Sequence, residues 1–209
     1  MLAKFCIGKT ILASVIVQSL LNSTSTVSYF YCREDDPEKN DCISIFRGLL
    51  SQLLYHCQEI VPLCYEKSLV SGQLNLSSLG LAEKLLILSF ETIPKPFIII
   101  DGLDECNTAQ RKLVLTFFTN IVERLDEQEP GKLRVLFVSQ DFPDIKKALE
   151  AATILDLTPK DNENDIKSYV NAWSKRIEEK YELNSEDIKF IQESTLVRSQ
   201  GTAPYQKEI

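Results

Sequence analysis

Hydrophobic residues along this chain follow two alternating patterns. In some segments they recur at helical spacing, every three or four residues, and in others they form short unbroken runs rich in β-branched and aromatic residues. The helical spacing predicts helices over residues 10–21, 42–57, 79–90, 108–125, 143–152 and 164–181, and a shorter one from about residue 185. The unbroken runs predict strands over residues 26–32, 97–101, 133–139 and 153–157.

Apolar strands that alternate with helices are typical of an α/β protein with a mostly parallel sheet. The strand runs lack polar alternation, which indicates burial on both faces of the sheet. Helices dominate after residue 157. We therefore expect a core domain over residues 1–158 and the start of a small helical lid over residues 159–209.

One predicted strand, Phe97–Asp101, runs directly into a cluster of acids that includes Asp104 and Glu105. Acids at this position have a possible use, because ligands of open α/β sheets bind beyond the carboxyl ends of the strands. Asp101 also has a purely structural interpretation, as the residue that leaves the strand and caps a turn with Gly102.

Gly8, Lys9 and Thr10 stand at the start of the first predicted helix. They match the closing half of the phosphate-binding loop G-x-x-x-x-G-K-[ST], in which a helix N-terminus holds phosphate. Lys9 would reach the outer phosphates of a nucleotide, and Thr10 would place its hydroxyl on Mg²⁺. Lys9 could equally be a solvated residue at a helix start.

The two motifs complement each other, because a nucleotide-bound Mg²⁺ needs a carboxylate as well as the loop hydroxyl. Asp101 would supply that carboxylate. Glu105, with Asp104, would then polarise a water molecule against the terminal phosphate. The pair of motifs predicts a site for ATP or GTP with Mg²⁺.

Charge and composition argue against nucleic acid and membranes as partners. The formal net charge is -7 and no basic cluster is visible, which argues against nucleic acid. The apolar stretch over residues 11–21 is too short for a membrane-spanning helix.

The six cysteines form no CxxC pair and there is one histidine, which favours reduced thiols in the cytoplasm. An alternative is a secreted cysteine-containing protein, since the N-terminus has some features of a signal peptide.

Several stretches resemble a known family. "GKT", "VSYFYC", "PFIIIDGLDEC", "RVLFVSQDFPDI" and "DIKSYV" are similar to the NACHT-type P-loop NTPase domain of fungal STAND proteins. These nephrocystin-like N-terminal modules often precede ankyrin or WD40 repeats. The likeness covers residues 8–201 and implies a three-layer P-loop NTPase sheet and an ATP- or GTP-gated switch. It also implies protein partners that act through effector or repeat domains absent from this chain.

The resemblance assigns roles to the motif residues. It gives Lys9 and Thr10 the Walker A functions and Asp101 the contact to Mg²⁺. Asp104 and Glu105 correspond to the acidic patch of the Walker B region.

The chain departs from the family at the phosphate-binding loop and at a possible sensor. Ala3 and Cys6 replace glycines that let the loop wrap phosphate. Ser139 and Gln140 stand where the family often has Ser-Arg, and glutamine brings no charge to a transition state. We expect a degenerate Walker A loop with slow or no hydrolysis, so whether the protein is an enzyme stays open. The alternative is a degenerate scaffold or fragment that keeps the fold, binds no nucleotide and acts at most in protein interaction.

The ends of the chain also depart from the family. The family places the strand before the phosphate-binding loop in the middle of the sheet, yet only Met1 and Leu2 precede the first glycine position of the loop. The tail after residue 201 is polar and divergent. We expect this first strand to be largely missing and the chain to be truncated at both ends.

Overall fold

A computed structural model describes residues 8–23, 26–62, 64–66, 76–157, 161 and 163–199. Residues 197–199 are described through their backbone alone. One compact unit is Thr10–Ala152, and the described residues outside that range belong to a second. The division into a core of residues 1–158 and a lid from residue 159 stays a prediction. The missing first strand, Ala3 and Cys6 all concern positions outside the described residues.

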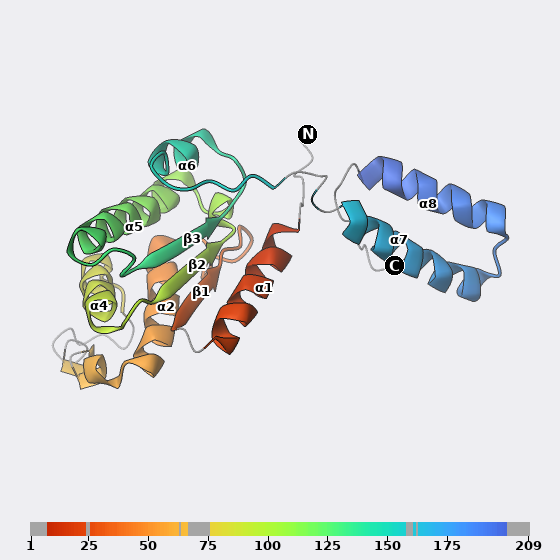
Figure 1. Cartoon of the computed structure of the whole chain (residues 1–209). Helices are drawn as coiled ribbons and strands as arrows, with labels where there is room; N and C mark the ends of the chain where they lie inside the picture. Colours follow the sequence, from red (N-terminus) through yellow and green to blue (C-terminus); the bar gives the residue numbers. More distant parts are fainter. Residues whose placement is uncertain are drawn as a thin grey trace. The chain divides into compact units, whose positions relative to one another are not determined.

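The Thr10–Ala152 unit is built around a parallel sheet of three strands (Figure 1). Their order across the sheet is β1 (Val27–Tyr31), β2 (Phe97–Asp101) and β3 (Arg134–Val138). Tyr31, Asp101 and Val138 occupy the same level of the ladder, so the three carboxyl ends meet at one edge. The predicted α/β class with a parallel sheet is confirmed.

Helices cover both faces of this sheet. The unit contains α1 (Lys9–Asn22, of which Lys9 alone precedes the unit), α2 (Cys42–His56), α4 (Leu79–Thr92), α5 (Thr108–Gln128) and α6 (Pro143–Ala148), with short 3₁₀ helices η1 (Gln58–Ile60) and η2 (Leu103–Glu105). The second unit holds α7 (Glu163–Tyr181) and α8 (Ser185–Ser199). Side chains one residue before α2, α4 and α5 accept a hydrogen bond from a first-turn N–H and so start these helices: Asp41, Ser78 and Asn107.

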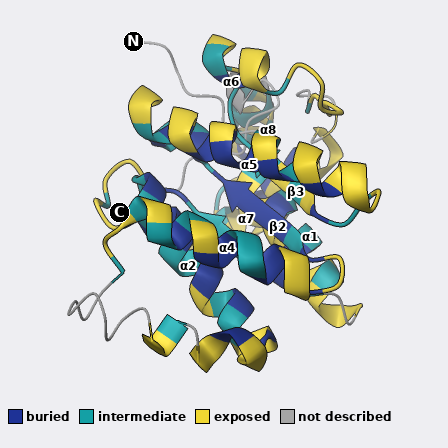
Figure 2. Cartoon of the chain, turned by 90° about the vertical axis from the view of Figure 1, so that its left-hand side faces the viewer, coloured by how far each residue is buried: buried dark blue, intermediate teal, exposed yellow. Residues whose placement is uncertain are grey.

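The central strand β2 sends alternate side chains into two cores. Ile98 and Ile100 belong to the larger core with α2, α4 and α5, whereas Ile99 packs with Val17 of α1. Figure 1 shows α1 on one side of the sheet and α2, α4 and α5 on the other. Figure 2 shows α4 and α5 with their buried sides toward the sheet and their exposed sides outward. The continuous apolar run of β2 thus reflects burial on both faces.

One side chain of α2 binds the backbone at the outer edge of β1. The Gln52 amide accepts a hydrogen bond from the Tyr29 N–H (3.0 Å) and donates one to the Tyr29 carbonyl (2.8 Å). A glutamine thereby satisfies the two backbone groups that a further strand would use. Among the described residues, no strand pairs with the outer edge of β3.

The predicted strand over residues 153–157 is wrong. These residues form no ladder, and Ile154 and Leu155 are 53% and 80% exposed. An apolar run becomes a strand only when another strand pairs with its backbone, and the described residues offer this run no partner. The predicted helix over residues 143–152 is also too long, since α6 ends at Ala148.

Candidate functional site

The loops that follow the three strands lie together at the carboxyl edge of the sheet. The ladder continues one step beyond the strands, where the Cys32 N–H bonds to the Asp101 carbonyl (2.8 Å) and the Gly102 N–H to the Val138 carbonyl (2.8 Å). These two bonds hold the first residues of neighbouring loops side by side. The acidic loop, which we define as residues 102–106, lies between the other two.

Asp101 ends β2 and is buried, with 4% of its surface exposed. The Thr10 hydroxyl and the Gly102 N–H lie near its carboxylate and favour the ionised form. Burial raises the pKa of Asp101, and the nearby charges of Asp104 and Glu105 raise it further, although the neighbouring Thr10 hydroxyl and Gly102 N–H lower it. The structure therefore brings together Thr10 and Asp101, the two residues predicted from the sequence to hold Mg²⁺.

The start of α1 has the properties of an anion site. Gly8 adopts a φ of 66° directly before the helix, a conformation that glycine enters readily. Lys9 and Thr10 are the first two helical residues, and the first turn contains no acidic residue. The leading N–H groups of a helix have no partners inside it and favour negative ligands.

The oxygen donors at Thr10 and Asp101 suit Mg²⁺, which prefers hard oxygen ligands. No group of three or more His, Cys, Asp or Glu side chains in the described part of the chain could hold a metal ion. Mg²⁺ in nucleotide sites usually takes one or two carboxylates and completes its shell with phosphates and water. The pair therefore fits an ion that arrives with a nucleotide better than a permanently bound metal.

Asp104 and Glu105 each accept a hydrogen bond from the backbone of a neighbouring loop. Asp104 Oδ1 accepts from the Gln140 N–H (3.0 Å), and Glu105 Oε2 accepts from the Glu34 N–H (2.9 Å). Both residues are half-buried. Because an ionised carboxylate can accept several hydrogen bonds, these contacts leave acceptor capacity for a water molecule.

Gly102 makes the sharp turn between the metal-binding candidate and the acids. Its φ is 73°, and a Cβ added there would lie 3.0 Å from the Cys32 carbonyl oxygen. A side chain at this position would therefore be strained and crowded. The turn swings the chain into η2, whose residues 104 and 105 carry the two carboxylates.

Ser139 and Gln140, the predicted sensor, directly follow β3. Ser139 Oγ donates to the Gln140 carbonyl (3.1 Å), while the Gln140 N–H donates to Asp104. The sensor candidates are thus tied to the acidic loop through a backbone amide.

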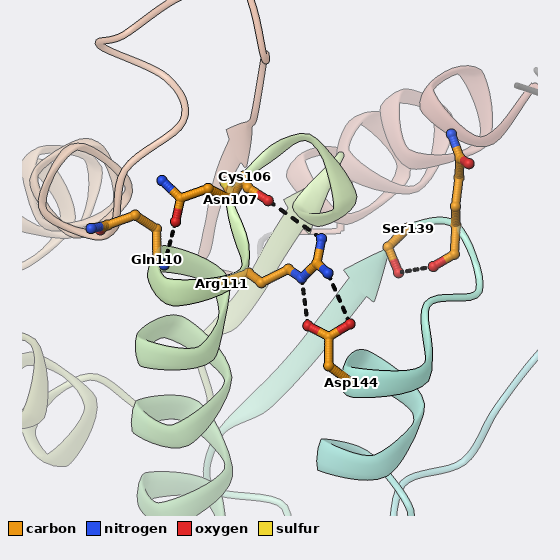
Figure 3. A network of polar contacts seen from close by, with 7 residues as sticks. Cys106, Asn107, Gln110, Arg111, Ser139 and Asp144 are labelled. Atoms are coloured by element: carbon orange, nitrogen blue, oxygen red, sulfur yellow. Dashed lines mark hydrogen bonds and ion pairs between the residues drawn. The ribbon is translucent and has the colours of Figure 1, made fainter. Parts of the chain in front are cut away.

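Sequence reasoning missed Arg111, a buried cation in the first turn of α5. Its guanidinium lies beside the acidic loop and pairs with Asp144 of α6 (Figure 3). A signal was present, because Arg111 shares the buried face of α5 with Val114, Leu115 and Phe118 at helical spacing. A charge on an apolar face requires a buried partner.

The five described cysteines are all free. Cys32 and Cys106 lie beside the site, and the neighbouring Cys106 side chain together with burial raises the pKa of Cys32 well above that of an ordinary thiol. Both are nearly fully buried in the larger core, where a neutral thiol behaves as a small hydrophobe. No helix in the described ranges is both long and apolar enough to cross a membrane.

The chain is similar to a protein family, to a curated relative and to a solved structure. The family model described as nephrocystin 3, N-terminal, matches residues 2–140. The vegetative incompatibility protein HET-E-1 of Podospora anserina is 25% identical over 174 residues, which cover 79% of this chain and 12% of that protein. The chain therefore spans only a small part of the curated relative. A solved structure, the Walker-type ATPase paby2304 of Pyrococcus abyssi, aligns with 90% of this chain and 54% of its own, at 16% identity and a TM-score of 0.43.

Proposed function

This chain belongs to the nephrocystin 3 N-terminal family, and from that premise we propose that it binds ATP or GTP together with Mg²⁺. The observation that carries the proposal is that the Thr10 hydroxyl lies near the buried Asp101 carboxylate. These residues are 91 positions apart in the chain (101 − 10), yet they meet where a helix N-terminus faces the carboxyl edge of the sheet.

Each residue of the site has a proposed role. The Lys9 ammonium and the first N–H groups of α1 bind the outer phosphates, and Gly8 allows the backbone to approach them. Thr10 and Asp101 hold Mg²⁺, which supplies charge neutralisation of the phosphates when bound.

Hydrolysis, if it occurs, would use Glu105. Its carboxylate accepts a proton from the attacking water, provided that it releases the Glu34 N–H or uses a free lone pair. Because Gln140 provides no positive charge, stabilisation of the transition state is weak. We therefore propose slow or no turnover, which suits a switch whose nucleotide state changes rarely. Protein partners of such a switch would act through regions outside this chain.

A second candidate function is a scaffold that keeps the fold and binds no nucleotide. It is favoured by the contacts of Asp104 and Glu105, since both carboxylates already join neighbouring loops through backbone hydrogen bonds. In that case the acids are retained for the structure of the edge alone.

Calorimetric titration separates the two functions. Mg·ATP and Mg·GTP are titrated into the wild-type chain and into Lys9→Ala. The proposed function predicts saturable binding of at least one nucleotide to the wild type and no detectable binding to the variant. Binding to neither protein would support the scaffold, whereas equal binding to both would remove Lys9 from the site.

A further inference from the structure

Arg111 and Asp101 are the two buried charged side chains, thiols aside, among the described residues. Asp101 has a role in the proposed nucleotide site, but Arg111 does not. Its side chain is 8% exposed. Burial of a guanidinium is unfavourable unless its donors are satisfied, so the contacts of Arg111 show what it holds together.

Three partners surround the guanidinium. Nε and Nη2 donate to the two oxygens of Asp144, at 2.6 and 2.9 Å, and Nη1 donates to the Cys106 carbonyl at 3.4 Å. Figure 3 shows these contacts, with Arg111 reaching from α5 toward α6 on one side and the acidic loop on the other. The guanidinium carbon also lies 4.7 Å from the centre of the Phe142 ring. A paired fork of this kind fixes orientation as well as distance.

These contacts, together with one from Gln140, hold both ends of residues 139–144, the segment that follows β3. At its start, the Gln140 N–H is bonded to Asp104. At its end, Phe142 and Asp144 are held by Arg111. The same arginine holds Cys106, the last residue of the acidic loop. Residues 139–144 and the acidic loop are therefore connected at two places. One connection is the direct bond between Gln140 and Asp104, and the other runs through Arg111, which binds both Asp144 and Cys106.

We propose that Arg111 is a positioning residue, which sets where the Ser139–Gln140 turn lies relative to Asp104. The inference rests on the proposed function in one respect: if the turn contacts the outermost phosphate, Arg111 controls how well the site distinguishes a nucleoside triphosphate from a diphosphate. Lysine cannot replace it, because the three N–H donors of an ammonium lie on one nitrogen. They cannot span both oxygens of Asp144 and the Cys106 carbonyl as the guanidinium does.

The chain offers a matched control on the same helix. Arg124 also forms an arginine–carboxylate contact, with Glu91 at 2.9 Å, but both side chains are nearly half exposed and lie away from the acidic loop. Arg111→Lys and Arg124→Lys therefore make the same chemical change at a buried and an exposed ion pair. Asp144→Asn serves as a second variant if Arg111→Lys does not fold.

The first measurement uses the chain without nucleotide. Amide hydrogen exchange of Gln140 is compared with exchange in β2 by NMR, which corrects for any change in global stability. Arg111→Lys or Asp144→Asn should lower the relative protection of the Gln140 N–H by about tenfold, the change expected when a hydrogen bond to a charged group is lost. Arg124→Lys should leave it unchanged. Equal loss of protection at Gln140 and in β2 would overturn the positioning role.

The second measurement is the ratio of the affinities for Mg·ATP and Mg·ADP. Arg111→Lys should lower this ratio by roughly threefold to tenfold with little change in affinity for the diphosphate, and Arg124→Lys should not change it. A purely structural ion pair would weaken both nucleotides equally, and that result would overturn the link to phosphate discrimination. If the wild type binds neither nucleotide, the proposed function fails, and the exchange data still decide whether Arg111 positions the turn.

Discussion

Replacing Asp101 with asparagine should stabilise the ligand-free chain. Burial raises the pKa of this carboxyl, and the charges of Asp104 and Glu105 raise it further. The neighbouring Thr10 hydroxyl and Gly102 N–H lower the pKa, but they offset these effects only in part. At neutral pH the ionised Asp101 is therefore less favourable in the folded chain than in the unfolded chain, and the neutral amide removes this cost.

The sign of the pH dependence follows from the raised pKa. An acid whose pKa is raised by folding contributes stability while it is protonated, and this contribution is lost as the pH rises through the folded-state pKa. Below about pH 3.9, the pKa of an unfolded aspartate, wild type and Asp101→Asn are both uncharged at this position. The stability difference between them should be smallest there and should grow toward pH 7. Replacing an unfavourable buried charge of this kind typically stabilises a protein by about 0.5–2 kcal/mol, and each kcal/mol raises Tm by roughly 2–4 °C in a chain of this length.

The assay is thermal and urea unfolding of both proteins between about pH 2 and pH 8, a range that extends below the ordinary pKa of aspartate, without nucleotide or Mg²⁺. Asp144→Asn is a control of opposite sign, because Arg111 lowers the pKa of Asp144. That variant should lose about 1–3 kcal/mol at pH 7, less than for a fully buried pair since the Asp144 side chain is 36% exposed. Its deficit should shrink as the pH falls through the lowered pKa. An Asp101→Asn protein no more stable than wild type at pH 7, or a difference that does not change with pH, would refute the reasoning.

Two further predictions test the acidic loop. Glu105→Gln should keep nucleotide binding while phosphate release stops, as followed by calorimetry and a phosphate assay; an unchanged rate would remove Glu105 from the mechanism. Gly102→Ala should cost about 1–3 kcal/mol in urea unfolding, because the position has a φ of 73° and the new Cβ would approach the Cys32 carbonyl. Gly80→Ala is its control, since a Cβ there meets nothing within 4 Å, and a loss of equal size at both positions would contradict the argument from strain.

The sequence allowed the class of the fold and one contact of the site to be predicted, because both depend on local patterns. The unbroken apolar runs indicated buried parallel strands, and β2 does bury Ile98, Ile99 and Ile100 on two faces. The contact between Thr10 and Asp101 followed from two motifs that require each other for Mg²⁺. In each case the information lies in residue type and spacing, which do not depend on what packs nearby.

Arg111 and Gln52 could not be assigned in the same way, since their roles depend on partners far away in the chain. Gln52 has an ordinary position on an amphipathic helix, and only the fold shows that its amide meets the backbone of Tyr29. Arg111 stands on an apolar helix face, which signals a buried partner but does not identify Asp144. Contacts between side chains of distant segments arise from the packing of whole elements.

The two edges of the sheet show why the prediction for residues 153–157 failed while the other strand predictions succeeded. All four runs have the residue types of strands, but a strand also needs partners for its N–H and C=O groups. Gln52 occupies the backbone groups of Tyr29 at the β1 edge, whereas no strand in the described ranges pairs with the outer edge of β3. The run containing Ile154 and Leu155 has no such partner among the described residues, so its residue types alone do not make it a strand. The same dependence applies to any segment that would complete the sheet, because its position is determined by the open edge rather than by its own apolar sequence.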